Sequence, residues 1–397
     1  MADAPWLTIV GLGEDGPDGL SSASLRALEN AETVMGAARH LELLPDLACD
    51  TVEWPVPFAD GIEVLLGLRG HRVVVLASGD PFWFGAGTVL ARHLDPSEWY
   101  ALPGPSTFSL AAARLGWGLE QTTCLGLHAA PLTRLRPHLS QSARLIVLLR
   151  DGGAVGELAL YLTTQGFEGS SLTVMEALGG PRERVTQVSV AEEMVHSFSH
   201  PVCVGIEAVG DGLPLVPGRD DELFDHDGQI TKSPMRALTL AALAPRPSES
   251  LWDIGGGSGS ISIEWLLSHP TTQAIAIEAD AARAARIADN AATMGVDRLK
   301  VVTGRAPDIL TDLPLPDVVF VGGGLSGALL TWLWEHLRPG ARVVANAVTL
   351  ESEAVLANWH ADKGGDLLRI ELARSQTLGS RRGWKSAYPV VQWSVTR

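Results

Sequence analysis

The alternation of apolar and polar positions predicts strands and helices along the whole chain. In the first half, short apolar runs indicate strands at about residues 6–10, 71–77, 145–149, 172–176 and 202–208. Helix signals begin at Ser21, and an alanine-rich run that opens at Thr107 predicts a helix as far as Leu115. We therefore expect the first half to be an α/β fold of about 210 residues.

The alternation restarts in the second half with a regular spacing. Strands are predicted near residues 251–254, 273–277, 300–303, 317–321 and 342–347, with helical stretches between them. Two further runs, at about 366–372 and 388–394, have no helix of useful length between them and should pair antiparallel at a sheet edge. Five parallel strands closed by this pair form a doubly wound sheet, whose ligand site lies at the carboxyl ends of the strands.

The stretch between the two halves has a different composition. It is rich in Gly and Pro and then carries five acidic residues: Asp220, Asp221, Glu222, Asp225 and Asp227. Such a composition is typical of a linker. We therefore expect a domain over residues 1–210, an acidic linker over 211–228 and a second domain over 229–397.

Composition excludes several classes of protein. No apolar run approaches the ~20 residues of a membrane helix, and no basic segment followed by an apolar stretch opens the chain, so we expect a cytoplasmic protein that does not bind membranes. The formal net charge of -16 opposes binding to nucleic acid. Cys49, Cys124 and Cys203 are far apart and form no CxxC pair, so we expect neither a disulfide framework nor a metal site.

A glycine-rich turn follows the first strand of the second half. Asp253 ends that strand, and Gly255, Gly257 and Gly259 lead into a helix. Glycines let the backbone pass close to a ligand, and a helix N-terminus offers unpaired N–H groups. A dinucleotide fingerprint would need glycine at position 260, where the chain has Ser260. An acid followed by G-x-G-x-G is instead the first signature of methyltransferases that use S-adenosylmethionine (SAM).

An earlier turn, Gly11-Leu-Gly13-Glu-Asp-Gly16, matches the letters of the dinucleotide fingerprint. Its context does not match, because Pro17-Asp-Gly19 intervenes and the helix begins about five residues after the last fingerprint glycine. A nicotinamide oxidoreductase is therefore a distant alternative.

The later strands of the second half also end in candidate binding residues. Glu278 follows the glycine turn by about twenty residues, where a carboxylate can accept both ribose hydroxyls; its alternative role is a helix-capping acid before Asp280. Ala306 lies in a stretch of small residues of the kind that flanks an adenine ring. Residues 321–324 read Val-Gly-Gly-Gly, whereas enzymes that methylate DNA bases carry an Asp/Asn-Pro-Pro-aromatic sequence there. This difference disfavours base methylation.

The C-terminal tract suggests an anionic ligand. From residue 372 to the end there is no Asp or Glu, and the tract carries Arg374, Arg381, Arg382, Lys385 and Arg397. Arginine forks suit carboxylates, and Lys232 and Arg236 could complete a cationic rim. A solvated rim or a contact between subunits explains any single one of these residues as well. No catalytic constellation is evident, which agrees with methyl transfer, where alignment of donor and acceptor is the main work.

Three motifs of the first half resemble the tetrapyrrole (corrin/porphyrin) methylase family, whose fold has two α/β lobes. They are Val10-Gly-Leu-Gly13, Ser78-Gly-Asp-Pro81 and Pro103-Gly-Pro-Ser-Thr107. The second half resembles a Rossmann-like class I SAM methyltransferase domain, of the kind that methylates a meso carbon and removes a carboxyl group, through Thr231-Lys232, the Asp253 turn and residues 321–324. Nearly the whole chain is thus similar to the fused, decarboxylating methyltransferases of cobalamin biosynthesis.

This resemblance implies two SAM sites, one in each half, and a polycarboxylate substrate. The implied reaction methylates precorrin-6B at C5 and C15 and removes the carboxyl of the C12 acetate, which gives precorrin-8X. The implied SAM contacts of the first half are Asp80, Trp83, Ser106 and Thr107, with Gly11 and Gly13 lining the cleft. Those of the second half are Thr231, Gly255, Gly256, Gly257, Ser258, Gly259, Glu278 and Ala306. Position 278 holds Glu where relatives often have Asp, and either carboxylate can bind a diol.

The resemblance also suggests residues for the substrate, and other hypotheses stay open. Arg381, Arg382 and Lys385 could anchor acetates and propionates, while no residue is assigned to deliver the proton of the decarboxylation. Relatives of both halves assemble, so a homo-oligomer is expected. In one alternative, only the second half is catalytic and the first half holds the tetrapyrrole. In another, the chain is a nucleic-acid methyltransferase with a targeting domain, which the net charge disfavours.

Overall fold

The computed structural model of the chain describes residues 5–44, 47–191 and 197–397. The chain divides into two compact units: residues 1–132 with 138–211, and residues 133–137 with 212–397. Residues 212–228, which we expected to be a linker, are thus part of the second unit. None of the helices in the described ranges is long and apolar enough to cross a membrane.

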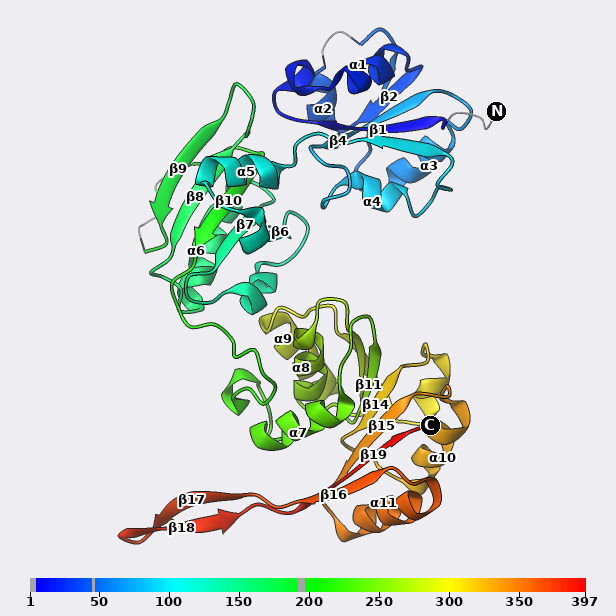
Figure 1. Cartoon of the computed structure of the whole chain (residues 1–397), viewed down its shortest axis with the longest axis vertical. Coiled ribbons are helices and arrows are strands. Elements are labelled where there is room, and N and C mark those ends of the chain that lie inside the picture. Colours follow the sequence, from blue (N-terminus) through cyan, green and yellow to red (C-terminus); the bar gives the residue numbers. More distant parts are fainter. Residues whose placement is uncertain (1–4, 45–46, 192–196) are drawn as a thin grey trace. The chain divides into compact units, whose positions relative to one another are not determined.

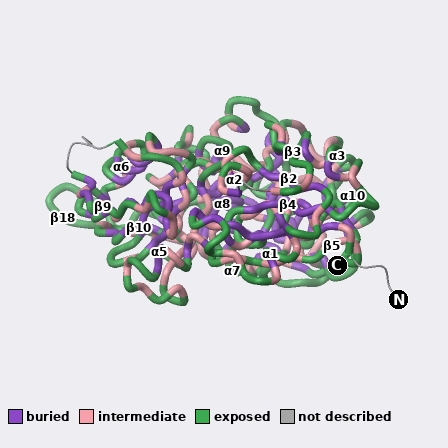
Figure 2. The backbone as a smooth tube through the Cα atoms, turned by 90° about the horizontal axis from the view of Figure 1, so that it is seen from above, coloured by how far each residue is buried: buried purple, intermediate pink, exposed green. Residues whose placement is uncertain are grey.

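The first unit begins with a parallel sheet of five strands in the order β3-β2-β4-β1-β5. Its strands are β1 (Leu7–Leu12), β2 (Thr33–Gly36), β3 (Asp50–Glu53), β4 (Val73–Ser78) and β5 (Trp99–Leu102). The accompanying helices are α1 (Ser22–Glu29), α2 (Ala38–Glu42), α3 (Asp60–Leu66) and α4 (Ala86–Leu90). The two strands predicted here are confirmed as β1 and β4, which lie at the centre of the sheet; Figure 2 shows buried backbone along β2 and β4.

A second, mixed sheet completes this unit, in the order β6-β7-β10-β8-β9. Its strands are β6 (Thr123–Gly126), β7 (Arg144–Leu148), β8 (Ser171–Glu176), β9 (Arg184–Ser189) and β10 (Val202–Glu207). The helices are α5 (Thr107–Leu115) and α6 (Ala154–Thr164). The bounds of α5 follow from local chemistry: the Ser106 hydroxyl accepts the Ser109 N–H at the start, and Gly116 adopts φ 68° at the end. The predicted strands at 145, 172 and 202 are confirmed.

The second unit contains one sheet of seven strands, in the order β13-β12-β11-β14-β15-β19-β16 (Figure 1). The strands are β11 (Ser250–Ile254), β12 (Gln273–Glu278), β13 (Lys300–Thr303), β14 (Val318–Val321), β15 (Arg342–Ala347), β16 (Asp366–Ile370) and β19 (Val390–Thr396). The first five are parallel, and β19 runs antiparallel to both β15 and β16. The predicted doubly wound sheet and its antiparallel closing pair are therefore confirmed.

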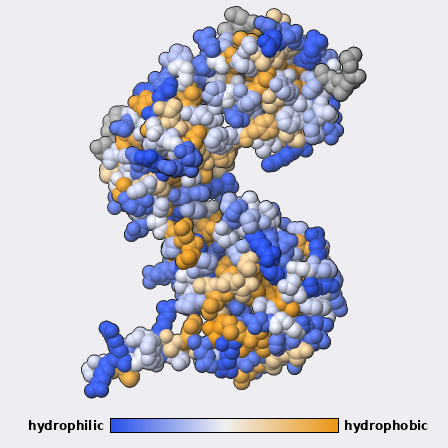
Figure 3. All heavy atoms as spheres, in the orientation of Figure 1, coloured by the Kyte–Doolittle hydropathy of each residue, from blue (hydrophilic) through white to orange (hydrophobic). Residues whose placement is uncertain are grey.

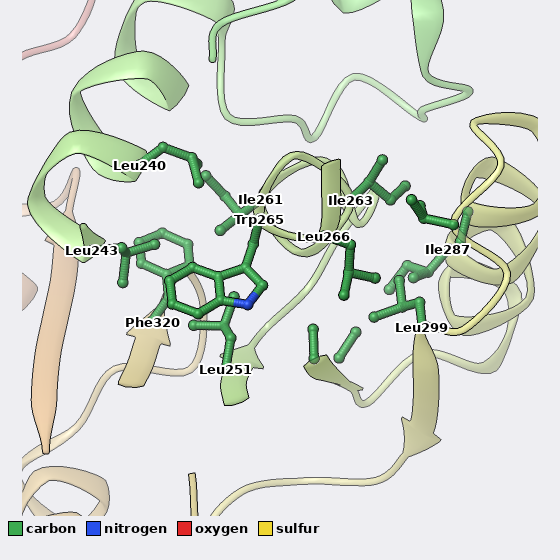
Figure 4. Packing of buried hydrophobic residues seen from close by; sticks show 14 of the residues in the cluster. Leu240, Leu243, Leu251, Ile261, Ile263, Trp265, Leu266, Ile287, Leu299 and Phe320 are labelled. Atoms are coloured by element: carbon green, nitrogen blue, oxygen red, sulfur yellow. The ribbon is translucent and has the colours of Figure 1, made fainter. Parts of the chain in front are cut away.

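Five helices cover the two faces of this sheet: α7 (Ser233–Leu243), α8 (Ser260–Ser268), α9 (Ala281–Thr293), α10 (Gly327–His336) and α11 (Leu350–Lys363). Successive residues of a strand point to opposite faces, so Leu251 packs with α7, α8 and α9 while Trp252 packs with α10 and α11. Figure 4 shows the first of these layers, in which Trp265 lies among Leu243, Leu251 and Phe320.

A two-stranded hairpin, β17 (Ala373–Leu378) and β18 (Arg381–Ser386), is inserted between β16 and β19. Figure 1 shows it leaving the body of the second unit as an arm, and Figure 3 shows hydrophilic residues over its outer part. All its residues except Gly383 are exposed. The sequence did not predict this hairpin, because neither of its strands has an apolar face.

Candidate functional site

The second unit has a cavity of about 770 Å3 at the carboxyl ends of its parallel strands. Such a position is where open α/β sheets bind ligands. The predicted residues that line it are Thr231, Lys232, Gly255, Gly256, Gly257, Ser258, Glu278 and Ala306. The structure therefore brings together all the SAM contacts predicted for this half except Gly259.

Gly255, Gly257 and Gly259 of the turn all have positive φ, but each has a different structural role. A Cβ on Gly255 would come 2.6 Å from the Cα of Gly323, so this glycine lets two turns pack together. A Cβ on Gly259 would come 2.7 Å from Ile287, and Gly259 stands at the N-cap of α8 rather than in the cavity wall. A Cβ on Gly257 would come no closer than 3.5 Å to any neighbouring atom, so the backbone of Gly257 is open to a ligand.

Two carboxylates lie beside this turn. Asp253 is buried, and its Oδ2 accepts hydrogen bonds from the hydroxyl of Ser262 at 2.6 Å and from the Ser262 N–H at 3.2 Å. Burial raises the pKa of Asp253 to about 6; the bonds from Ser262 oppose this rise and the charge of Glu278 adds to it. Asp253 therefore fixes the first turn of α8 from within the core.

Glu278 combines the two roles that the sequence left open. One carboxylate oxygen accepts the Gly257 N–H at 2.9 Å, and the other accepts the Asp280 N–H at 3.0 Å, so the side chain does support the start of α9. It also lines the cavity and is 7% exposed. A carboxylate has about four acceptor positions, so two remain for a ligand diol.

Arg236 does not lie at the cavity rim, contrary to the prediction. Its side chain is fully buried, and its Nε donates to Glu264 at 2.7 Å. The remaining guanidinium donors bind Asp221, the Thr231 carbonyl and the Arg219 carbonyl. Because every edge of the guanidinium is used inside the protein, Arg236 supports the Thr231 segment and is not a substrate contact.

The acidic segment before α7 is packed rather than free. Glu264 accepts the N–H groups of Gly218 and Arg219 at 2.7 and 3.0 Å. Asp227 pairs with Arg283 and Arg286 of α9, and the hydrogen bond from Arg283 lowers the pKa of Asp227 to about 2. The charges that suggested a linker therefore attach this segment to the second unit.

The basic C-terminal tract lies mostly outside the cavity. Arg374, Arg381, Arg382 and Lys385 are on the exposed hairpin, and Arg397 ends the chain after β19. The residues on either side of the hairpin, Leu372 and Tyr388, do line the cavity, and Lys232 lines it while its Nζ lies 3.4 Å from Asp221. Of the predicted substrate anchors, the structure thus places only Lys232 at the cavity.

The first unit has its own cavity, of about 930 Å3, lined by residues of both its sheets. The predicted residues that line it are Gly13, Asp80, Trp83, Ser106 and Thr107. Asp80 ends the β4 turn and accepts the Phe82 N–H at 2.8 Å. Gly11 is not in the lining; a Cβ there would overlap the carbonyl oxygen of Gly79, so Gly11 allows two turns to meet behind the cavity.

Sequence reasoning missed a polar group in the first-unit cavity. Glu14 is 8% exposed and pairs with Arg39 and with Arg182. The His40 Nε2 lies 2.9 Å from the Ser78 hydroxyl, and burial, with a contribution from Arg39, lowers the pKa of His40 to about 4. Glu14 and Ser78 lie within motifs of the sequence, but no motif marks Arg39, His40 and Arg182, which come from α2 and from the segment between β8 and β9 and meet the other two only in the fold.

A second missed residue is Asn346, at the end of β15 in the second-unit cavity. Within the described ranges, no group of three or more His, Cys, Asp or Glu side chains is arranged to hold a metal ion. The three cysteines are unpaired.

Known proteins resemble both units. Residues 6–193 match the family model of the tetrapyrrole (corrin/porphyrin) methylases, and residues 222–397 match that of the precorrin methyltransferase domain. A Sinorhizobium sp protein named precorrin-6Y C(5,15)-methyltransferase (decarboxylating) is 50% identical over 401 residues, which cover 99% of this chain and 97% of that protein.

Shorter proteins match part of the chain. A Salmonella typhimurium protein named cobalt-precorrin-6B C(15)-methyltransferase (decarboxylating) is 33% identical over 178 residues, which are 43% of this chain and 91% of that protein. A solved structure also matches: the C-terminal domain of precorrin-6Y C5,15-methyltransferase from Rhodobacter capsulatus, by crystallography. Its sequence is 57% identical, the TM-score is 0.46, and the match spans 47% of this chain and 100% of the Rhodobacter chain. Because the Sinorhizobium relative matches along almost its whole length, the chain belongs to the precorrin-6Y C5,15-methyltransferase (decarboxylating) family of SAM-dependent enzymes.

Proposed function

We propose that each unit binds one SAM and that the chain methylates precorrin-6B at C5 and C15 and removes the carboxyl of the C12 acetate, giving precorrin-8X. The observation that carries this proposal is the presence of two separate cavities, each lined by the residues that its own family resemblance implies. Two cavities of about 770 and 930 Å3 fall in the usual size range of small-molecule sites.

The second-unit cavity is suited to SAM in its own geometry. The open backbone of Gly257 admits a ligand close to the turn, and the free acceptor positions of Glu278 suit the two ribose hydroxyls. Ala306 and its neighbours offer the small surface that an adenine ring needs. When bound, SAM supplies an electrophilic methyl group on sulfur. The residues around it bind, orient and exclude water, which is the main requirement of an in-line displacement.

The first-unit cavity offers a different set of contacts. Asp80 supplies a carboxylate at the end of β4, and Ser106 and Thr107 lie at the N-terminus of α5, where backbone N–H groups are available. Trp83 packs beside Phe108, with ring centroids 5.0 Å apart, and gives the cavity an apolar wall. These residues would hold the SAM that serves the first methylation site.

We assign methylation at C15 and the decarboxylation to the second unit. The Salmonella relative, whose name carries both activities, covers 43% of this chain, and the precorrin methyltransferase domain model matches residues 222–397. Methylation at C5 then falls to the first unit. Lys232, at the second cavity, would attract one of the carboxylates of the substrate.

We also propose that the chain works as a homo-oligomer and does not bind nucleic acid. The hairpin exposes Leu378 and Trp384, which are 72% and 79% exposed, and an isolated two-stranded hairpin is marginally stable in water. The net charge of -16 repels phosphates. Light scattering that shows a monomer at micromolar concentration would contradict the homo-oligomer. Tight, salt-dependent binding of RNA would contradict the absence of nucleic-acid binding.

The test is to incubate the full chain with precorrin-6B and methyl-labelled SAM. We expect two labelled methyl groups per tetrapyrrole and one carbon dioxide released. If one methyl group is transferred and calorimetry finds one SAM site per chain, only the second unit is catalytic and the first is a binding module. No transfer to precorrin-6B by the folded chain would refute the proposal as a whole.

A further inference from the structure

The two sides of the second-unit cavity differ in polarity. The side formed by the ends of β11, β12 and β13 carries the turn and Glu278, where we place the nucleotide. The opposite side is formed by the ends of β14, β15, β16 and β19, and its apolar lining comprises Phe320, Val348, Ile370, Leu372, Ala387 and Val390. Asn346 and Tyr388 carry the polar side-chain atoms among the lining residues that these strands and their flanking loops contribute, and Tyr388 is 88% exposed; Thr231 and Lys232, just before α7, also line the cavity.

Hydrogen bonds fix the orientation of the Asn346 amide. The hydroxyl of Thr239 donates to the Met235 carbonyl at 2.8 Å, so the Thr239 oxygen can only accept from its other neighbours. The Nδ2 of Asn346 donates to that oxygen at 3.0 Å. The Nε2 of Gln392 donates to Asn346 Oδ1 at 2.9 Å and lies 3.3 Å from the Thr239 oxygen. This pattern is consistent only if the nitrogen of Asn346 faces Thr239.

The residues that hold Asn346 are more deeply buried than Asn346 itself. Thr239 is fully buried and Gln392 is 4% exposed, whereas Asn346 is half-buried and reaches the cavity. An amide can make four hydrogen bonds, and the network uses two of them. One N–H and one carbonyl lone pair of Asn346 therefore remain for a ligand on the apolar side.

We propose that Asn346 is a further catalytic residue of the second unit, whose free N–H binds and orients the acetate carboxylate that leaves as carbon dioxide. Thr239 and Gln392 are positioning residues that act through it. This inference rests on the proposed function of the second unit.

A neutral amide suits this step better than a cation. The bond between the acetate methylene and its carboxyl carbon breaks, and the electron pair moves into the conjugated ring, so the carboxylate loses its charge in the transition state. An arginine would add a full positive charge opposite the carboxylate and would therefore stabilise the charged ground state more than a neutral amide does. Only interactions that are stronger in the transition state accelerate a reaction. The amide orients the group with a smaller ground-state penalty.

The two steps in this cavity also balance in protons. Methyl transfer forms a carbon–carbon bond at the meso carbon and breaks the carbon–sulfur bond, with the electron pair staying on sulfur, and the meso hydrogen leaves as one proton. Loss of carbon dioxide leaves a methylene that takes up one proton and becomes a methyl group. Together the two steps neither consume nor release a proton, so the apolar side needs an orienting group and no further co-reactant.

The test compares products of the full-length chain and its variants by mass, counting methyl groups and carboxyl groups separately. We expect Asn346→Ala and Asn346→Asp to lower the ratio of decarboxylation to methylation by up to about a hundredfold, the cost of a misplaced reacting group. The affinity for S-adenosylhomocysteine, measured by calorimetry, should stay at the wild-type value. Asn346→Asp should lower this ratio more than Asn346→Ala does, because it places a negative charge beside the carboxylate.

Thr239→Val and a matched control separate positioning from stability. Thr239→Val should lower the same ratio, because it removes the oxygen that holds the amide. Thr272→Val removes an equally buried hydroxyl that donates to the His269 carbonyl at 2.7 Å and does not line the cavity. It should cost similar stability and leave the ratio unchanged. A wild-type ratio in Asn346→Ala and Thr239→Val overturns the inference alone, whereas a wild-type chain that methylates and decarboxylates nothing overturns the proposed function with it.

Discussion

Glu278→Gln gives a direct test of the nucleotide side of the second cavity. The substitution keeps the shape of the side chain and removes its charge. The Glu278 oxygens accept the Gly257 and Asp280 N–H groups at 2.9 and 3.0 Å, so an amide nitrogen must face one of these donors or the cavity. In either arrangement the acceptors left for a ribose diol are fewer and uncharged.

The expected size of the effect follows from these contacts. Hydrogen bonds to a charged group contribute about 1.5–3 kcal/mol, and every 1.4 kcal/mol changes the dissociation constant about tenfold. We therefore expect Glu278→Gln to weaken binding at this site by about tenfold to a hundredfold. Glu278→Ala should weaken it more, because the Gly257 N–H then loses its acceptor and the turn loses its support.

The assay is calorimetry with S-adenosylhomocysteine, which binds without turnover. The wild-type chain should show two sites, and Glu278→Gln should weaken one of them. Asp80→Ala is the matched control, since Asp80 lines the other cavity and its loss should weaken the other site. Unchanged binding in Glu278→Gln would refute this placement of the nucleotide. If either variant weakened both sites while the protein remained folded, the division into two sites would be wrong.

Four further substitutions test the fold, two in the first unit and two in the second. Gly11→Ala should destabilise the first unit by about 1–3 kcal/mol, because the new Cβ overlaps the Gly79 carbonyl, whereas Gly156→Ala, with open space in α6, should stabilise it by about 0.5–1 kcal/mol; calorimetric melting compares them. The raised pKa of Asp253, about 6, means that its carboxyl stabilises the folded state at low pH and that this contribution is lost as pH rises through about 6. Relative to Asp253→Asn, wild type should therefore lose about 1 kcal/mol between about pH 5 and about pH 8 in urea unfolding, and a constant difference would contradict the raised pKa. Glu264→Ala should cost about 3–5 kcal/mol, because Arg236 then keeps only Asp221 as an anionic partner and the Gly218 and Arg219 N–H groups lose their acceptor; an unchanged melting temperature of the second unit would contradict this.

Much of the second unit could be predicted because its signals are local. Each strand is a short apolar run, and the turn from Asp253 to Gly259 carries its chemistry in consecutive residues. The hairpin β17–β18 escaped prediction because its polar strands bury neither face. Strands β2 and β3 of the first unit, with four residues each, are too short to show a period.

The roles of single polar residues were the hardest to predict, because they depend on distant partners. The sequence suggested that Arg236 is a cation at the cavity rim. In the structure it pairs with Glu264, 28 positions away, and lies in the core. Asn346 carries no motif, and its orientation depends on Thr239, which is 107 positions away. A sequence pattern shows which residues can bind a ligand, but the fold decides which of them face it.

The central claim, that one chain carries two methyl-transfer sites and one decarboxylation, is tested most directly by carbon-13 NMR of the product. The full chain would be supplied with precorrin-6B and SAM labelled with carbon-13 in the methyl group. We expect two labelled methyl resonances, at C5 and C15, and an unlabelled methyl group in place of the C12 acetate. A single labelled resonance, or an intact C12 acetate beside two labelled methyl groups, would contradict this account.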